Sequence, residues 1–246
     1  ILSNWQPISN ITQKWNTFQS TAVGVQRIGQ LFEEKPDVVD APNPASIDPD
    51  RVRGEIVFDG IAFAYQPDIP VIRHLDLYVR PGDTIGIVGT TGAGKSSLIS
   101  LLCRMYDVNE GSIRIDGTDI RDIPQQTLNR IVGLVQQEPF LYSGSILDNV
   151  RLFDESIPPS EVVRACELVG IDPLIRRMKQ GYETRISESG SGLAAGERQL
   201  ISFARIIVFR PRILILDEAT SNLDSYSEQL IQRALQVVSQ DRTTLI

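Results

Sequence analysis

The chain has 246 residues, of which 41% are hydrophobic, and its formal net charge is −7 at pH 7. This length and composition suffice for a full α/β core and a second small lobe. The acidic balance argues against a nucleic-acid partner, whose binding surface normally has a basic excess. The single histidine, His74, excludes a multi-histidine metal site, and neither Cys103 nor Cys166 has metal-ligand spacing. We expect both cysteines to be buried thiols in a reducing compartment.

The first 35 residues predict one long amphipathic helix, and residues 36–53 have the Pro/Ala/Asp composition of a linker. No apolar run of about 18 residues occurs, so nothing here is expected to span a bilayer unaided. The apolar positions of the helix recur every three or four residues. They are Trp5, Ile8, Ile11, Trp15, Phe18, Ala22, Val25, Ile28 and Phe32.

Strand patterns begin after residue 54 and are interrupted by one helical stretch. Alternation at 56–58, 61–65 and 75–79, with turn signals at Asp59-Gly60 and Pro81-Gly82, predicts a small antiparallel sheet. Between about residues 138 and 205 the pattern is helical, with helices expected at 161–169 and 174–178. Further apolar runs predict strands at 85–88, 113–115, 131–135 and 213–216, and a closing amphipathic helix is expected at 226–238.

The loop that follows the run at 85–88 fits G-x-x-x-x-G-K-[ST]. Apolar residues at helical spacing follow it (98, 101, 102 and 105), so the loop lies between a strand and a helix, as a phosphate-binding loop requires. Its glycines let the backbone approach a triphosphate, Lys95 reaches the terminal phosphates and Ser96 offers a hydroxyl to Mg²⁺. The nucleotide-binding residues are Gly89, Thr90, Thr91, Gly92, Ala93, Gly94, Lys95, Ser96 and the adjacent Ser97.

Two carboxylates, Asp217 and Glu218, end the buried run at 213–216. We expect Asp217 to hold the water shell of the metal and Glu218 to act as general base on the attacking water. The loop, its context and this distant acidic pair together predict a site for a nucleoside triphosphate and Mg²⁺.

With these pieces in order, residues from about 54 onward resemble the nucleotide-binding domain of an ABC exporter half-transporter of the multidrug or lipid type. The resemblance implies an α/β P-loop NTPase fold. It would have a RecA-like core, a small antiparallel β-subdomain and an inserted helical subdomain at about 138–205. The implied activity is ATP hydrolysis coupled to export, with this fragment weak or inactive by itself.

The resemblance also assigns roles to single residues. Tyr65 stands where the family stacks an aromatic ring on adenine, and Gln137 matches the glutamine that bridges Mg²⁺ and the attacking water to the helical lobe. Asp224 lies in a segment, 221–224, that matches the loop meeting the opposing subunit. The segment 140–146 is similar to exporter surfaces that touch the membrane domain.

The signature segment departs from the family, which has Leu-Ser-Gly-Gly-Gln there and clamps the γ-phosphate of the partner subunit with it. A serine hydroxyl is lost, a glycine gains a methyl group, and a carboxylate, unfavourable near a triphosphate, replaces the final amide. Because Glu218 is intact, we expect a heterodimer whose partner has an intact signature; a homodimer that tolerates the variant is the alternative. The five residues are Leu193, Ala194, Ala195, Gly196 and Glu197.

The ends of the sequence carry two further expectations. Residues 1–35 resemble the cytoplasmic end of the last transmembrane helix, and the family's switch histidine would follow the strand at 243–246. We therefore expect a fragment, truncated before that histidine. Its partners would be a second ABC subunit and a transmembrane domain. The transported cargo would be a small molecule, lipid or peptide, and the domain would lie on the cytoplasmic side of the cell membrane.

Three other functions compete with this interpretation. The weak signature also suits an ATP-binding regulatory module that gates a partner without efficient hydrolysis, although the intact Glu218 disfavours it. A DNA-repair or chromosome ATPase predicts coiled-coil heptads between the two ATP motifs and a basic surface, and the sequence has neither. The ATPase of a nutrient importer is a separate subunit, whereas this chain begins with a membrane-helix-like segment.

Overall fold

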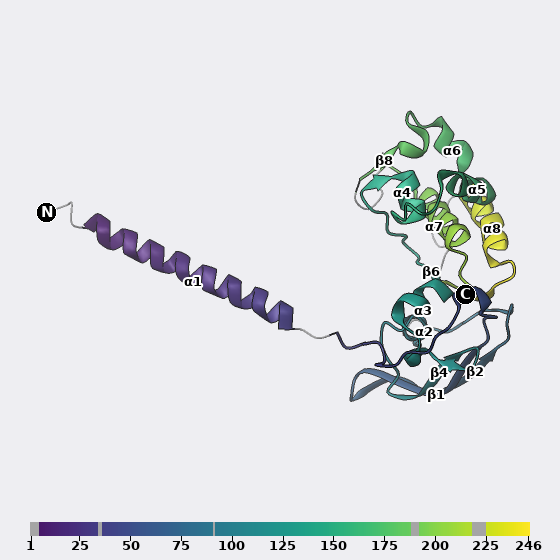
Figure 1. Ribbon diagram of the computed structural model, residues 1–246, viewed down its shortest axis with the longest axis horizontal. Helices are drawn as coiled ribbons and strands as arrows, with labels where there is room; N and C mark the ends of the chain where they lie inside the picture. The colour runs from purple at the N-terminus through teal and green to yellow at the C-terminus, as the bar shows by residue number, and fades with distance from the viewer. Residues whose placement is uncertain (1–4, 34–35, 91, 188–191, 218–224) are drawn as a thin grey trace. The chain divides into compact units, whose positions relative to one another are not determined.

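A computed structural model of the chain describes residues 5–33, 36–90, 92–187, 192–217 and 225–246. It divides into two compact units, Ile1–Val39 and Asp40–Ile246. The first contains one helix, α1 (Trp5–Glu33), the long coil in Figure 1. From Ile11 onward its apolar stripe is exposed, with 59% of Trp15 and 65% of Phe18 accessible to solvent. Among the described helices, none is both long enough and apolar enough to cross a membrane.

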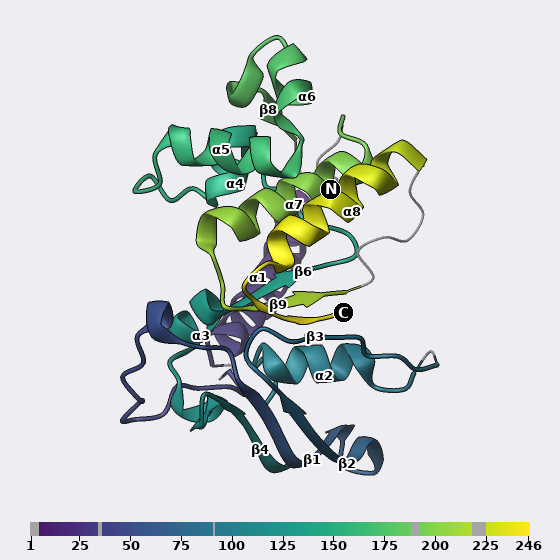
Figure 2. The ribbon, with the colours of Figure 1, turned by 90° about the vertical axis from the view of Figure 1, so that its right-hand side faces the viewer.

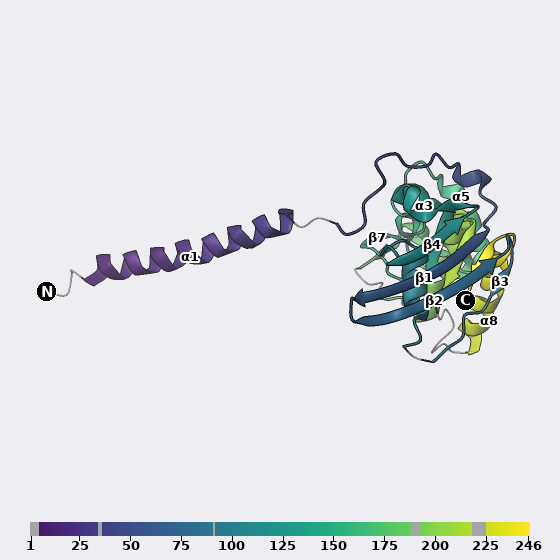
Figure 3. The same ribbon diagram turned by 90° about the horizontal axis from the view of Figure 1, so that it is seen from below.

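The second unit begins with an antiparallel sheet, whose long strands lie side by side in Figure 3. Strand pairing runs in the order β2-β1-β4-β5, which agrees with the predicted small sheet. Apolar side chains on β1 and β4, Ile56, Phe58, Ile113 and Ile115 among them, are at most 1% exposed and form one side of a core. The strands are β1 (Ile56–Gln66), β2 (Ile69–Val79), β4 (Glu110–Ile115) and β5 (Thr118–Asp119).

The predicted turn at Asp59-Gly60 is wrong, because both residues lie inside the single long strand β1. The register with β2 shifts between Phe58 and Ile61, where β1 has one extra residue and forms a bulge. Gly60 has a φ of +56°, which a glycine adopts without strain. Its N–H donates to Asp76 Oδ1 on β2 at 2.6 Å, so the bulge is held by the neighbouring strand.

A second sheet is parallel throughout and has the order β3-β10-β9-β6. Its strand β9 is buried at all four positions, as a strand covered on both faces requires. Alternate residues face two different cores: Ile213 and Ile215 pack with the antiparallel sheet and α2, whereas Leu214 and Leu216 pack with the helical lobe. The strands are β3 (Thr84–Ile85), β6 (Val132–Val135), β9 (Ile213–Leu216) and β10 (Thr243–Leu245).

Helices cover both faces of this sheet. In Figure 2, α7 and α8 lie on one side, and α2 with the antiparallel sheet lies on the other. The helical lobe contains α4, α5 and α6, which pack with α7 in one core. The helices are α2 (Lys95–Leu102), α3 (Gln125–Ile131), α4 (Ile146–Arg151), α5 (Pro159–Val169), α6 (Asp172–Arg177), α7 (Ala195–Phe209) and α8 (Ser225–Ser239).

Three boundaries differ from the sequence prediction. The strand expected at 85–88 is only Thr84–Ile85 and is not fully buried, since β3 pairs with β10 alone and Val88 is 93% exposed. Ile131 ends α3 rather than opening β6. Helix α2 ends at Leu102, before Arg104 with its positive φ of 51°, so Met105 lies outside it. The expected strand at 213–216 and the expected helix at 161–169 are confirmed.

Cys166 is buried, as expected, whereas Cys103 is half-buried. Burial raises the pKa of the Cys166 thiol to about 12 and that of Cys103 to about 11. Both groups therefore remain protonated thiols near neutral pH.

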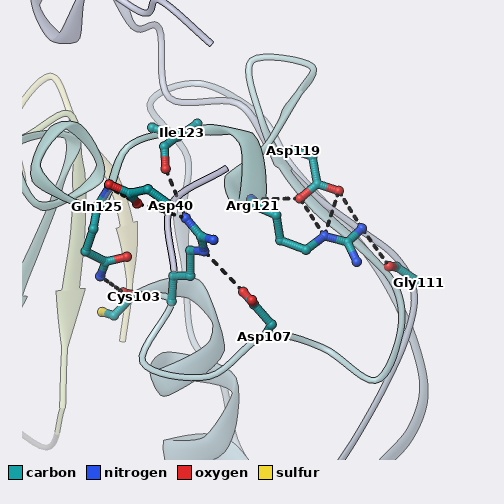
Figure 4. A network of polar contacts seen from close by, with 9 residues as sticks. Asp40, Cys103, Asp107, Gly111, Asp119, Arg121, Ile123 and Gln125 are labelled. Carbon is teal, nitrogen blue, oxygen red and sulfur yellow. Dashed lines mark hydrogen bonds and ion pairs between the residues drawn. The ribbon is translucent and has the colours of Figure 1, made fainter. Parts of the chain in front are cut away.

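Residues 40–53, which have the composition of a linker, belong to the second unit. Figure 4 shows Asp40 among polar partners from α3 and the loop after α2. Its Oδ1 accepts from the Gln125 backbone N–H at 2.9 Å and lies 3.5 Å from Nη1 of Arg104. Further along, Val52 is only 6% exposed and packs in the core. This segment is thus fastened at both ends.

Asp40 supplies a helix cap that the local sequence lacks. Pro124 precedes α3 and has no side-chain acceptor, so the free N–H of Gln125 takes its acceptor from Asp40. We expect Asp40→Ala to lower the free energy of unfolding by about 1 kcal/mol, the usual worth of such a cap. Urea denaturation measures this, with Asp37→Ala, exposed and outside the second unit, as the charge-matched control. Equal stability of the two variants would contradict the capping role.

Candidate functional site: a phosphate loop at the carboxyl edge of the parallel sheet

The glycine-rich loop connects β3 with α2, between a strand and a helix as predicted. Gly94 caps α2 with a φ of +90°, and Gly92 has a φ of +83°, both in the left-handed region that favours glycine. A Cβ on Gly89 would lie 3.0 Å from the Cβ of Ala93. The loop therefore turns tightly enough to need glycines at these points, and it leads directly into the N-terminus of α2, whose first amides can bind phosphate.

Lys95 is the first residue of α2, and its ammonium folds back over the loop. Its Nζ donates to the carbonyl oxygens of Gly89 at 2.7 Å and Thr90 at 3.3 Å. The positive charge thus lies at the loop, and both of these acceptors are neutral carbonyl oxygens. Thr91, also predicted to bind nucleotide, lies outside the described residues.

The two serines that follow differ in exposure. Ser96 is exposed in the first turn of α2, while Ser97 is 8% exposed. Ser97 Oγ accepts a hydrogen bond of 3.1 Å from the hydroxyl of Tyr65. This bond ties the predicted adenine-stacking residue on β1 to the helix that begins with Lys95.

Tyr65 is held by two further aromatic rings. Its ring lies edge-to-face with Phe63 at 4.8 Å between centroids and with Tyr106 at 5.1 Å. It is nevertheless 51% exposed, and it borders a hollow of about 530 Å³ whose lining includes Pro70 and Ile72. An exposed, fixed ring beside such a hollow can stack on a planar base.

The sheet topology brings the distant acidic residue to the loop's edge. Strands β3, β6 and β9 run parallel in one sheet, so their carboxyl ends lie at the same edge. The phosphate loop follows β3, Gln137 follows β6, and Asp217 follows β9 directly. The Asp217 N–H donates to Val135 O at 2.9 Å, which fixes the end of β9 against β6. This edge is where ligands bind in open α/β sheets.

Two predicted residues, Glu218 and Asp224, lie outside the described part of the chain. In the sequence, Glu218 directly follows Asp217, the last residue of the described range 192–217.

The signature segment, residues 193–197, leads into α7, and two of its hydrogen bonds are local to the start of that helix. Glu197 accepts from the Ala194 N–H at 2.8 Å, and Arg198 donates to Leu193 O at 2.7 Å. Ala194 occupies the N-cap position with extended backbone, φ −65° and ψ 158°. Glu197, expected as a repulsive charge toward a triphosphate, is thus directed back to cap its own helix, and it forms one half of a capping box.

Ala194→Ser is expected to complete this capping box, because the serine oxygen can accept from an otherwise free N–H of the first turn. The free energy of unfolding should rise by about 1 kcal/mol, which for a domain of this size is about 2–4 °C in Tm. Ala195→Ser, one residue inside the helix, is the matched control and should give no gain. An equal gain for both variants would show that the cap is not the cause.

An aromatic face lies beside this site, built from Phe140, Tyr142 and Phe153, each about half exposed. The rings contact edge-to-face, with centroids 5.0 Å apart for the first pair and 6.1 Å for the second. Phe140 and Tyr142 also line a hollow of about 960 Å³ together with residues of β6 and α7. Exposed apolar clusters of this kind are typical of interaction surfaces.

Two residues of the site could not be found from the motifs. Tyr106 fixes Tyr65 from a loop 41 positions away in the chain, and no local pattern signals such a contact. Arg205 carries a charge inside the buried stretch of α7, between Ala204 and Ile206. A charged residue within an apolar stretch can be noticed in the sequence, but only the fold shows which groups it contacts.

The fold and the loop at its sheet edge define a P-loop nucleotide-binding domain. A family model described as ABC transporter matches residues 72–221. The probable multidrug resistance ABC transporter ATP-binding/permease protein YheH of Bacillus subtilis is 41% identical, over 98% of this chain and 35% of its own length. The fatty acid ABC transporter ATP-binding/permease protein of Mycobacterium bovis is 39% identical, over 98% and 37%.

A solved structure of a bacterial Atm1-family ABC exporter with ATP bound superposes with a TM-score of 0.83. Its sequence is 34% identical, and the match covers 94% of this chain and 40% of that one. The chain belongs to the ABC transporter family and is an ATP-binding domain homologous to those of ABC exporters. This confirms the predicted fold class and family. The chain spans about a third of the length of the curated relatives it matches.

Proposed function

We propose that this chain is the ATP-hydrolysing motor domain of a membrane exporter. The observation that supports it most is the shared carboxyl edge of β3, β6 and β9, where the phosphate loop, Gln137 and Asp217 follow their strands. ATP-driven pairing of two such domains would pull on membrane helices, and hydrolysis would release them. ATP binding follows from the family; hydrolysis and export by the whole protein are our inference.

The residues of the loop fit a bound nucleotide. Tyr65 stacks on the base, and stacking without hydrogen-bond readout makes base selectivity loose. Backbone amides of the loop and Lys95 hold the phosphates; Lys95 exchanges its loop carbonyls for phosphate oxygens, which are stronger acceptors because they are charged.

The donor set also fits Mg²⁺, which prefers oxygen ligands. Ser96 offers a hydroxyl, Gln137 an amide oxygen and Asp217 a carboxylate at one sheet edge. When bound, the ion neutralises charge that develops on the phosphates. Glu218 orients and polarises the attacking water in line with the γ-phosphate, so the protein's contribution is mainly positional and electrostatic.

The assembly we infer is a dimer in which each site combines one chain's phosphate loop with the other chain's signature. Ala194 removes the hydroxyl that would bind the partner's γ-phosphate, while Glu218 is intact. We therefore favour a heterodimer, in which this chain's site is completed by a partner with a full signature. A homodimer remains the alternative and would show strong cooperative ATPase activity from this chain alone.

Two exposed apolar surfaces suit a transmembrane domain. The α1 stripe would contact neighbouring membrane helices as the cytoplasmic end of the last one, and the aromatic face of Phe140, Tyr142 and Phe153 would receive the membrane domain's cytoplasmic part. The domain would then lie on the cytoplasmic side of a cell membrane. We propose that the cargo is a small molecule, lipid or peptide.

Titration calorimetry of this chain with ATP and Mg²⁺, followed by phosphate release from the full-length assembly, tests the proposal. We expect saturable binding, competition by GTP, and hydrolysis only in the assembly. Failure to bind ATP would contradict the proposed site. Tight binding without any turnover in the assembled dimer would instead favour a regulatory module that gates its partner.

A further inference from the structure

Arg205 is the one residue of the buried stretch of α7 that carries a charge. Its neighbours Ala204 and Ile206 are 0% and 6% exposed, and they pack in the core of the helical lobe. Burial lowers the pKa of the Arg205 guanidinium to about 10, so the group remains charged at neutral pH. A charge kept in such a place must be balanced by specific hydrogen bonds.

Three hydrogen bonds supply that balance, and all of them end on neutral oxygens. Nε donates to Asn149 O at 2.8 Å, Nη2 to Asn149 Oδ1 at 3.2 Å, and Nη1 to Phe140 O at 2.9 Å. Arg205 therefore contacts α4 through Asn149 and the segment after β6 through Phe140. The planar fork of a guanidinium, with donors in fixed directions, suits such a three-point contact.

Asn149 extends the contact along the same segment. It is fully buried, and it pairs with the Tyr142 backbone in both directions: Tyr142 N–H donates to Oδ1 at 2.8 Å, and Nδ2 donates to Tyr142 O at 2.9 Å. Nδ2 also donates to Ser145 O at 3.0 Å. The two side chains thus fix Phe140, Tyr142 and Ser145 against α4 and the middle of α7. These three residues belong to the segment 136–145, which follows β6 and ends at α4.

We propose that Arg205 is a positioning residue that makes the segment 136–145 and helix α7 respond to nucleotide as one body. The inference rests on the proposed function, in which Gln137 contacts the metal-bound nucleotide and the start of α7 faces the partner's nucleotide. Binding at the chain's own site would then be transmitted through segment 136–145 and Arg205 to the signature at 193–197. The exposed rings of Phe140 and Tyr142 lie on the same segment, so the membrane-domain surface is coupled to both.

Hydrogen–deuterium exchange of this chain, with and without ATP and Mg²⁺, tests the inference. In the wild type, ATP should slow exchange in the phosphate loop (89–97), in the segment 136–145 and in the first turns of α7. Arg205→Met keeps a stem that packs in the same space and removes all three donors. We expect this variant to bind ATP with unchanged affinity, to keep the slowing at 89–97 and 136–145, and to lose it in α7.

Arg210→Met is the control, because Arg210 is exposed at the end of the same helix and its loss removes an equal charge. It should behave as the wild type. Retained slowing in α7 of Arg205→Met would overturn the inference, since packing alone would then suffice. If Arg205→Met exchanges faster throughout the domain, Arg205→Lys is used in its place. A weaker ATP-dependent slowing of exchange in α7 would then support the inference, and slowing equal to that of the wild type would overturn it.

The wild-type result separates this inference from the proposed function. No slowing at 89–97 would mean that the loop does not bind ATP, and the proposed function fails. Slowing at 89–97 and 136–145 without any change in α7 would leave nucleotide binding intact and overturn only the role of Arg205.

Discussion

Replacing Lys95 with alanine is expected to lower the affinity of this chain for ATP by about 10- to 100-fold. The ammonium lies at the mouth of the phosphate loop, 2.7 Å from Gly89 O, and would donate to charged phosphate oxygens when nucleotide binds. Charged hydrogen bonds of this kind contribute about 1.5–3 kcal/mol, and each 1.4 kcal/mol is a factor of about ten in the dissociation constant. Calorimetric titration with ATP and Mg²⁺ measures the change.

Lys179→Ala is the control for this experiment. Lys179 is exposed in the helical lobe after α6, so its loss changes net charge equally without touching the loop. If both variants bind ATP as the wild type does, the loop is not the phosphate site.

The second large effect is expected from Glu218→Gln. The amide has nearly the same shape as the carboxylate but cannot accept the proton of the attacking water. Turnover should fall by about 10²- to 10⁴-fold, the usual contribution of a general base, while ATP affinity is retained. Phosphate release from the full-length assembly with its partner measures turnover, and titration measures affinity.

Glu228→Gln makes the same chemical change on the exposed surface of α8 and should leave turnover unaltered. Normal turnover in the Glu218 variant would refute its assignment as the base. A fall in affinity equal to the fall in turnover would place Glu218 in binding instead, because an interaction made only in the transition state leaves ground-state binding unchanged.

The sequence predicted the parts of the fold that depend on local pattern. The strand at 213–216 is apolar at every position and buried on both faces, so periodicity and length sufficed to find it. The phosphate loop was found because its glycines are required by positive φ at Gly92 and Gly94, a local constraint. Family, fold class and helical lobe followed from the order of these pieces.

Features decided by particular hydrogen-bond partners could not be predicted from residue pattern in this way. The signal at Asp59-Gly60 is a turn signal in isolation, but pairing with β2 on one side and β4 on the other extends one strand through it. The helix cap at Glu197 was not predicted either: its carboxylate accepts from the Ala194 N–H. At Gly60 the deciding partner is an acceptor on the neighbouring strand, Asp76 Oδ1, whereas at Glu197 it is a backbone donor, the Ala194 N–H.

The fastened segment 40–53 bears on how the ATP-binding domain can be excised for separate study. Ile47 and Val52 cover apolar side chains of the core, and Asp40 supplies the acceptor for α3. A recombinant domain that begins at Gly54, where the strand pattern begins, would expose that apolar surface to solvent. We expect it to aggregate during purification. A recombinant domain should therefore begin before Asp40, so that residues 40–53 still cover the apolar core.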